Sequence, residues 1–380
     1  MNERAAPVLG PDATIGILGG GQLGRMLALA AAKLGLKCHV LAPDPVSPAF
    51  EVVRRATIAD YTDTEALDRF AADVDVVTYE FENIPADTAM FLASRRAVLP
   101  NPSVLAITQD RLIEKDFVAG LGIRTAPYVA VENRDALKDA LETIGRPAVL
   151  KTRRFGYDGK GQATIRNAAD LDAGWAVVGG QPSILEAFVP FEREVSVVTA
   201  RSRDGQVECF DVTENEHRDH ILKSSRAPAS ISPALAAEAV SIARRVAEAF
   251  DYVGVLAAEL FVVREGDRDN LLINEIAPRV HNSGHWTLDG ASVSQFEQHI
   301  RAIAGWPLIR PVRRGRVEMT NLLGTEIEDY ARWLTVPGAS LHLYGKANIR
   351  DGRKMGHVTV VEPDSSAAPA TRGNLQSISE

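Results

Sequence analysis

Cysteine is scarce in this chain of 380 residues, and long apolar runs are missing. The two cysteines, Cys38 and Cys209, are too few for a disulfide framework or a cysteine-rich metal site, so buried thiols in a reducing compartment are expected. No apolar run is long enough to span a bilayer, and the opening segment MNERAAPVLGPDA lacks the apolar core of a signal peptide. We therefore expect a cytosolic protein.

The chain also lacks an excess of positive charge. It has 42 lysines and arginines against 50 acidic residues, which gives a net charge of −8. This balance argues against nonspecific binding to nucleic acid and favours small anionic ligands held by local basic clusters. What the chain does have is 46% hydrophobic residues over a length that suffices for two or three domains with cores of their own.

Patterns along the chain divide it into segments. From residue 14 to about residue 100, strand and helix patterns alternate, as in a parallel α/β unit. Pro100 and Pro102 interrupt this pattern, and one helical stretch is expected over residues 103–122. We predict an N-terminal α/β domain (1–102), a second domain (103–305) with a small lobe at about 123–185, a β-rich C-terminal domain (306–365) and a disordered polar tail (366–380).

A glycine-rich loop, RRFGYDGKGQ, follows an apolar run that ends in a lysine. Glycines allow close approach of the backbone and positive φ, and backbone N–H groups with nearby cations suit a polyphosphate. The loop would also be flexible enough to close over a nucleotide, although a polar hairpin turn is the plainer alternative. The residues expected to contact ATP here are Lys151, Gly156, Tyr157, Asp158, Gly159, Lys160, Gly161 and Gln162.

Two apolar segments, VLAAELFVV and LLINEIAP, are typical of buried strands joined as a hairpin. Glu259 lies within the first, and Asn274 and Glu275 lie within the second. A carboxylate in an apolar strand is costly unless a cation or donors compensate it. We therefore predict that Glu259 and Glu275 hold Mg²⁺ together with nucleotide phosphates. A glutamate facing solvent at a sheet edge is the alternative.

The loop RVHNSGHWT follows this hairpin directly. It brings Arg279, His281 and Asn282 beside the predicted metal, where such polar density suits an anion or a polar substrate. Zinc is not expected, because His281 and His285 have no cysteine or third histidine at ligand spacing. A surface loop with chance histidines is the competing interpretation.

A glycine pattern at residues 19–24, Gly-x-Gly-x-x-Gly, matches the dinucleotide fingerprint between a strand and a helix. Asp44 follows at about the right distance, so the pattern alone would indicate an NAD-dependent oxidoreductase. Gln22 and Leu23 within the turn, and the prolines on both sides of Asp44, argue against this. A helix N-terminus can serve either ligand, so the pattern by itself does not decide.

Together these segments resemble the ATP-grasp superfamily and, within it, the biotin-independent carboxylases of purine synthesis. The resemblance runs from Thr14 to about Val360. Two departures are visible: Phe155 stands where the family loop often has glycine, and Val280 interrupts the family's Arg-Pro-His. The matching segments are GGGQLGRM, VTYEFENI, LKTRRFGYDGKGQ, EAFVPFEREVSV, TENEH, NEIAPRVHNSGHWT, LHLYGK and GRKMGHV.

The resemblance implies an α/β chain with the ATP-grasp fold, an N-terminal parallel α/β domain and a small β-rich C-terminal domain. It implies ATP- and bicarbonate-dependent carboxylation of 5-aminoimidazole ribonucleotide through carboxyphosphate, with Mg²⁺ and without biotin. The expected partners are these small molecules, not nucleic acid or a membrane, and the expected assembly is a homodimer.

The resemblance also implies roles for individual residues. Arg279, His281 and Lys151 would be catalytic. Further ATP contacts would come from Arg111, Glu186, Ala187, Phe188, Val189, Glu194, His217, Asn274 and Glu275. Contacts to the ribonucleotide would come from Gln22, Leu23, Glu80, Asn282, Lys346, Arg353 and Lys354, the last three at its 5′-phosphate.

Three alternatives stay open on sequence alone. Another ATP-grasp ligase, such as a formate-dependent glycinamide ribonucleotide transformylase, would share the phosphate and metal residues and activate a different acid. An NAD-dependent oxidoreductase would use the glycine turn. A nucleotide-binding protein without activity would have little use for the paired Glu259 and Glu275.

Overall fold

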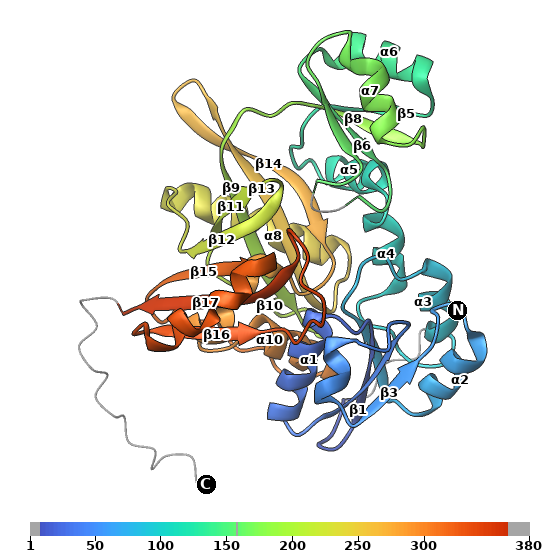
Figure 1. The fold of residues 1–380 in the computed structure, drawn as a ribbon, viewed down its shortest axis with the longest axis vertical. Helices are drawn as coiled ribbons and strands as arrows, with labels where there is room; N and C mark the ends of the chain where they lie inside the picture. The colour runs from blue at the N-terminus through green and yellow to red at the C-terminus, as the bar shows by residue number, and fades with distance from the viewer. Residues whose placement is uncertain (1–7, 157–158, 364–380) are drawn as a thin grey trace.

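The structure is a computed structural model that describes residues 8–156 and 159–363. Tyr157, Asp158 and the tail at 366–380 lie outside the described residues. Three β-sheets organise the described chain, one in the N-terminal domain, one in a small lobe and one that crosses the rest of the molecule (Figure 1). Within these residues no helix is long and apolar enough to cross a membrane.

The N-terminal residues form a parallel four-stranded sheet in the order β3-β2-β1-β4, which confirms the predicted α/β unit. Buried apolar residues fill β1 and β4, as in strands covered on both faces. Asp63 caps α2 by accepting from the N–H of Ala66. The elements are β1 (Thr14–Leu18), α1 (Gln22–Lys33), β2 (Lys37–Ala42), η1 (Pro48–Val52), β3 (Arg55–Ile58), α2 (Thr64–Ala72), β4 (Val76–Tyr79) and α3 (Ala86–Ala93).

The single helix expected over residues 103–122 is wrong, because two helices occupy this stretch. They are α4 (Pro102–Thr108) and α5 (Arg111–Gly120). Asp110 has an extended backbone and accepts from the N–H groups of Leu112 and Ile113. It therefore separates the two helices and caps the N-terminus of α5.

The small lobe is an antiparallel sheet in the order β5-β8-β6-β7, covered by two helices and standing apart at the top of Figure 1. The glycine loop joins β6 to β7 and therefore lies at one end of this sheet. The elements are β5 (Tyr128–Val131), α6 (Arg134–Ile144), β6 (Ala148–Thr152), β7 (Gln162–Ile165), α7 (Asp170–Val177) and β8 (Ser183–Ala187).

The large sheet has the order β14-β13-β9-β11-β12-β15-β17-β16, with β10 on β9. The C-terminal strands extend this sheet, because β15 pairs with β12, so one surface runs from β14 to β16. Its elements are β9 (Phe191–Arg201), β10 (Val207–Cys209), β11 (Thr213–Arg218), β12 (Ile221–Ala227), α8 (Pro233–Ala249), β13 (Gly254–Glu265), β14 (Arg268–Ala277), η2 (Asn282–Gly284), α9 (Thr287–Gly290), α10 (Gln295–Ala304), β15 (Arg316–Leu323), η3 (Gly324–Thr335), β16 (Ala339–Leu343) and β17 (Lys354–Glu362).

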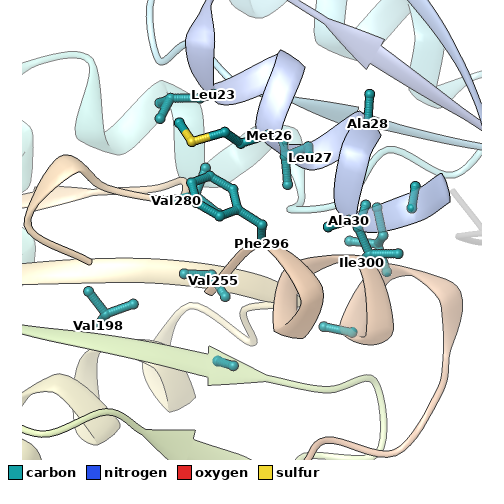
Figure 2. Packing of buried hydrophobic residues seen from close by; sticks show 14 of the residues in the cluster. Leu23, Met26, Leu27, Ala28, Ala30, Val198, Val255, Val280, Phe296 and Ile300 are labelled. Carbon is teal, nitrogen blue, oxygen red and sulfur yellow. The ribbon is translucent and has the colours of Figure 1, made fainter. Parts of the chain in front are cut away.

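One hydrophobic cluster joins the N-terminal domain to the large sheet. Figure 2 shows Met26 and Leu27 of α1 close to Phe296 and Ile300 of α10, with Val255 of β13 on the other side. All of these side chains are buried, and burying one such side chain contributes about 1.5–3 kcal/mol. The N-terminal domain is therefore held firmly against the sheet that carries the predicted metal hairpin.

Candidate active site

Two carboxylates face each other on the hairpin of β13 and β14. Glu259 pairs with Glu275 in the strand register, which confirms the predicted hairpin. A β-bulge follows, so Asn274 and Glu275 together lie opposite Glu259. Arg111 Nη1 donates to Glu275 at 2.8 Å, and His281 Nε2 lies 3.0 Å from a carboxylate oxygen of Glu259. These contacts compensate two carboxylates that would otherwise repel each other.

A third carboxyl group, Glu114 of α5, is buried near Glu275. Burial opposes ionisation of Glu275, but the charge and hydrogen bond of Arg111 outweigh it and lower the pKa of Glu275 to about 2. Burial and the negative charge of Glu275 raise the pKa of Glu114 to about 8. At neutral pH, Glu114 is therefore protonated and Glu275 is ionised.

Replacing Glu114 by glutamine is expected to stabilise the protein at alkaline pH. The pKa of Glu114 is raised from 4.5 to about 8 in the folded protein, so its stabilising contribution is complete below pH 4.5 and is lost as the pH rises through 8. Glutamine mimics the protonated acid at every pH. Urea unfolding should show the variant about 5 kcal/mol more stable than wild type at pH 9 and equal to it at pH 4. Equal pH dependence of the two proteins would contradict the protonated state of Glu114.

A buried carboxylate at the end of β8 lies among lysines. Lys151 Nζ donates to Glu186 Oε2 at 2.9 Å, and Lys115 Nζ lies 3.7 Å from the same oxygen. Burial opposes ionisation of Glu186, but the two ammonium charges lower its pKa to about 2. Its second oxygen is buried and has no hydrogen-bond partner among the described residues, so it can accept from a ligand. Lys115 also donates to the Asn274 carbonyl at 2.9 Å, which ties α5 to β14.

The glycine loop uses glycine where its backbone is left-handed. Gly159 and Gly161 have φ values of +79° and +71°, and a Cβ there would lie 2.7 Å from His220 and 2.6 Å from Thr152, respectively. Phe155 has φ of +62°, an unusual value for a bulky residue, and its ring is exposed. The position at which the family often has glycine is therefore one where the backbone favours glycine.

The loop is anchored to the start of α5. Arg153 makes three hydrogen bonds of 2.7–3.1 Å to the carboxylate of Asp110, so this arginine links the lobe to the helix. Arg111, already bonded to Glu275, donates to the carbonyl of Gly156 at 3.3 Å. Lys160 lies exposed within the loop. Sequence reasoning missed Asp110, although its position ahead of a helical pattern is a capping signal.

The segment after β8 is fixed by its backbone. The N–H of Ala187 donates to the carbonyl of Pro127 at 2.8 Å, and the N–H of Phe188 donates to that of Pro147 at 3.2 Å. Phe188 is exposed, and Val189 follows it toward β9. This segment is the strand-to-strand connection between the small lobe and the large sheet.

Glu194 of β9 and His217 of β11 form an ion pair at a pocket of about 290 Å³ on the large sheet. Burial would lower the pKa of His217, but the hydrogen bond and charge of Glu194 raise it above its ordinary value. Strands β9, β11 and β12 supply the lining. The two residues that were predicted separately are thus direct partners.

Arg279 follows β14 and forms a bidentate ion pair with Glu82. Its Nη2 donates to one carboxylate oxygen at 2.9 Å, and its Nε donates to the other. Burial opposes both charges, but the pairing raises the pKa of Arg279 and lowers that of Glu82. Glu82 follows β4, so the pair joins the N-terminal domain to the β13–β14 hairpin. Sequence reasoning missed Glu82, which lies in the same segment as Glu80.

Two amide side chains hold the loop that contains His281. Gln295 accepts from the N–H of His281 at 2.9 Å and donates to its carbonyl at 2.6 Å. Asn282, predicted to contact the ribonucleotide, exchanges hydrogen bonds of 3.0 and 2.7 Å with Asn321 of β15. Asn321 and Gln295 are fully buried, and neither was expected from the sequence.

Glu80 occupies the N-terminal end of α1. Its carboxylate accepts from the N–H of Gly21 at 2.8 Å and from that of Gly24 at 3.1 Å. A Cβ at Gly19 would lie 2.6 Å from the Glu80 side chain. In a dinucleotide-binding turn this place belongs to the pyrophosphate. Here a protein carboxylate fills it, which argues against the NAD-dependent interpretation.

Gln22 and Leu23 begin the same helix, and the Leu23 side chain packs into the hydrophobic cluster (Figure 2). The C-terminal segment approaches α1 at Gly345, where a Cβ would lie 3.4 Å from the Arg25 side chain. Lys346 Nζ donates to the carbonyl of Lys354 at 2.6 Å, and Lys354 acts electrostatically on His217. Arg353, by contrast, donates to the nearby carbonyl of Asn348 at 2.7 Å.

The hairpin offers oxygen donors to a metal ion. Among the described residues, no three or more His, Cys, Asp or Glu side chains are grouped to hold a metal. Two carboxylates, Glu259 and Glu275, face each other, and the amide oxygen of Asn274 is buried with no hydrogen-bond partner among the described groups. Hard oxygen donors of this number fit Mg²⁺, which keeps further positions for water and phosphate.

Family comparisons agree with this arrangement. Residues 12–109 match the ribonucleotide synthetase preATP-grasp domain, residues 116–296 match the ATP-grasp domain, and residues 318–371 match the phosphoribosylaminoimidazole carboxylase C-terminal domain. The predicted fold class, an ATP-grasp chain with an α/β domain before it and a small C-terminal unit after it, is thereby confirmed.

Several similar proteins are N5-carboxyaminoimidazole ribonucleotide synthases or synthetases by name. N5-carboxyaminoimidazole ribonucleotide synthase of Brucella melitensis is 50% identical over 93% of this chain and 98% of its own length. The synthetase structure from Thermus thermophilus has 47% identity and a TM-score of 0.85, covering 92% of this chain and 93% of that one. The Aspergillus clavatus synthase in complex with ADP and 5-aminoimidazole ribonucleotide has 30% identity and a TM-score of 0.86, covering 93% and 94%. The chain belongs to the N5-carboxyaminoimidazole ribonucleotide synthase family of ATP-grasp ligases.

Proposed function

We propose that this ligase uses ATP and bicarbonate to carboxylate the exocyclic amine of 5-aminoimidazole ribonucleotide. The proposal rests on one observation about the loop after β14. Arg279 contacts Glu82 at the end of β4, and His281 contacts Glu259 on the β13–β14 hairpin. A guanidinium and an imidazole at this junction suit a small anion that must meet both a nucleotide and an amine. The family relatives support the same reaction by name.

In the first step, Arg279 and His281 hold bicarbonate. A bicarbonate oxygen attacks the γ-phosphorus of ATP, the bond to the bridging oxygen breaks, and ADP leaves with the electron pair. The products are carboxyphosphate and ADP. Lys151, Arg111 and the backbone N–H groups of the glycine loop would stabilise the charge that develops on the phosphoryl oxygens.

Glu259, Asn274 and Glu275 would hold Mg²⁺ beside these phosphates. When bound, the ion would neutralise charge on the phosphoryl oxygens and orient them. Arg111 contacts Glu275 and His281 contacts Glu259, so the negative charge of the two carboxylates would be shared between these side chains and the cation.

On the nucleotide side, the adenine would meet the Glu186 oxygen that has no partner among the described residues, and the connection at residues 187–189. The ion pair of Glu194 and His217, which lines its own pocket, would contact the ribose. Closure of the glycine loop over the phosphates would exclude water, which otherwise hydrolyses carboxyphosphate.

In the second step, the exocyclic amine attacks the carboxyl carbon, or CO₂ released from carboxyphosphate. The carbon–nitrogen bond forms, phosphate leaves, and the amine loses a proton. Glu80, with Gln22 and Leu23 at the start of α1, would orient the amine, because a carboxylate at the carboxyl end of β4 can accept from it. Asn282 would help through the loop that it fixes, and the C-terminal cations Lys346, Arg353 and Lys354 would hold the 5′-phosphate.

Replacing Lys354 by alanine is expected to raise KM for the ribonucleotide. Loss of one charge-assisted contact to phosphate costs about 1.5–3 kcal/mol, or roughly ten- to a hundredfold in KM, while KM for ATP should change little. Arg316→Ala is the matched control, because Arg316 is exposed at the opposite end of the β15–β17 pair. An unchanged KM for the ribonucleotide would contradict a contribution of the C-terminal strands to the site.

Release of ADP by the purified protein tests the proposed reaction. With Mg-ATP, rapid formation of ADP should require both bicarbonate and 5-aminoimidazole ribonucleotide. The carbon of bicarbonate should appear in an acid-labile product. Dependence on formate in place of bicarbonate would favour the transformylase alternative. Retention of NAD in a thermal-shift assay, without ATP turnover, would favour the oxidoreductase. A homodimeric assembly and a cytosolic location stay predictions.

A further inference from the structure

A row of polar side chains, three buried and Glu259 half-buried, crosses four neighbouring strands of the large sheet. From β13 through β9 and β11 to β12 it consists of Glu259, Ser196, Asn215 and Ser225. Glu259 lies opposite Ser196 in the strand register, and Asn215 lies opposite Ser225. Both serines are fully buried, and Asn215 is 8% exposed. Buried hydroxyl and amide groups at this depth must be hydrogen-bonded, so their partners are informative.

These side chains form one continuous chain of hydrogen bonds that ends on His281. Ser225 Oγ donates to Asn215 Oδ1 at 2.8 Å, and Asn215 Nδ2 donates to Ser196 Oγ at 2.9 Å. Ser196 Oγ donates to Ser283 Oγ at 2.8 Å, and Ser283 Oγ lies 2.8 Å from His281 Nδ1. Each hydroxyl has one proton to donate, so the direction of any one bond sets the direction of the next.

A backbone group fixes that direction at the histidine end. The N–H of Ser283 points at His281 Nδ1 from 3.3 Å, and a backbone N–H can only donate. Nδ1 is therefore an acceptor, and the Ser283 hydroxyl, which already accepts from Ser196, donates to the same nitrogen. A neutral imidazole with Nδ1 as acceptor carries its proton on Nε2. That atom faces Glu259 at 3.0 Å.

We propose that Ser225, Asn215, Ser196 and Ser283 are positioning residues that hold His281 in the Nε2–H tautomer, so that it acts as a hydrogen-bond donor at the candidate active site. The role toward bicarbonate or carboxyphosphate rests on the proposed function. Both the N–H and the hydroxyl of Ser283 point at Nδ1, so the ring presents its N–H group at Nε2, on the side of the candidate active site. His281 therefore binds and orients an anion and does not remove the proton from the attacking amine.

Nitrogen-15 NMR of histidine-labelled protein tests the tautomer directly. In the wild-type enzyme without substrates, the His281 signal, assigned by its loss in His281→Gln, should show a protonated Nε2 and an unprotonated Nδ1. Ser283→Ala removes one donor to Nδ1 and should increase the share of the Nδ1–H tautomer, whereas Ser283→Thr keeps a hydroxyl and should restore the wild-type signal.

A distant, isosteric change gives a second test. In Asn215→Asp the new carboxylate cannot donate to Ser196, so Ser196 must donate back to it and the chain reverses. The His281 signal should shift as in Ser283→Ala. Ser224→Ala is the matched control, because Ser224 precedes Ser225 on β12 and its hydroxyl points instead toward Glu216, at 3.4 Å.

Kinetics separate this inference from the proposed function. Ser283→Ala should raise KM for bicarbonate about ten- to a hundredfold with little change in KM for ATP. Effects of this size are usual for residues that hydrogen-bond the second ring nitrogen of a ligand-binding histidine. A wild-type His281 that carries its proton on Nδ1, or on both nitrogens, would overturn the inference. So would a signal unchanged in both Ser283→Ala and Asn215→Asp. If the tautomer shifts but KM for bicarbonate is unchanged, the inference that the hydrogen-bond chain sets the tautomer would stand. The assignment of bicarbonate to His281 would then be contradicted.

Discussion

Replacing Glu275 by glutamine is expected to reduce ADP formation at least about a thousandfold while the protein stays folded. Glutamine keeps the size of the side chain and an oxygen that can accept from Arg111, so the packing of β14 is preserved. It removes the negative charge that faces Glu259 across the hairpin and that we assign to Mg²⁺. Single-turnover ADP release at saturating Mg-ATP would measure the chemical step.

The same variant has a second readout and a matched control. The charge of Glu275 helps to raise the pKa of Glu114 to about 8, so Glu275→Gln should lower that pKa and weaken the loss of stability at alkaline pH. Glu265→Gln is the control, because Glu265 lies exposed on the same hairpin and pairs with Arg124 at 2.5 Å. Normal ADP release by Glu275→Gln would remove this residue from the metal site.

Replacing Arg279 by methionine should damage both activity and stability. The guanidinium holds Glu82 with two hydrogen bonds, and both side chains are less than a third exposed. Leaving Glu82 without its partner should cost about 2 kcal/mol of unfolding free energy. Loss of the cation that we assign to bicarbonate should reduce kcat/KM about a hundred- to a thousandfold.

A second substitution separates these two effects. In the double variant Arg279→Met with Glu82→Gln, the unpaired charge is gone, so stability should return while activity stays low. Arg264→Met is the control, because Arg264 pairs with Asp269 at the exposed tip of the same hairpin. Activity that recovers together with stability would show that Arg279 serves only to hold Glu82.

Local patterns predicted the parts of the site that lie within one segment. The apolar runs around Glu259 and Glu275 indicated a hairpin, and the strand register places these two residues opposite each other. The alternating pattern up to residue 100 predicted the parallel sheet. Such predictions succeed because a buried strand needs a continuous apolar run, and a carboxylate within one stands out.

Contacts between distant segments could not be predicted in this way. Arg279 and Glu82 are far apart in sequence, and no periodicity relates them. The protonated Glu114 depends on its distance from Glu275, which only the packing of α5 on β14 determines. The break at Asp110 was available as a capping signal, yet the apolar pattern on both sides favoured one helix. The continuation of the large sheet into β15 likewise depends on strand pairing across the fold.

The most direct test of the proposed chemistry follows the oxygen atoms of bicarbonate. If a bicarbonate oxygen attacks the γ-phosphorus, that oxygen stays on phosphorus when the amine displaces phosphate. With ¹⁸O-labelled bicarbonate, Mg-ATP and 5-aminoimidazole ribonucleotide, measured before the label exchanges with water, we expect one labelled oxygen in each phosphate released. Phosphate that carries no label, formed at the same rate as ADP, would contradict carboxyphosphate as the intermediate.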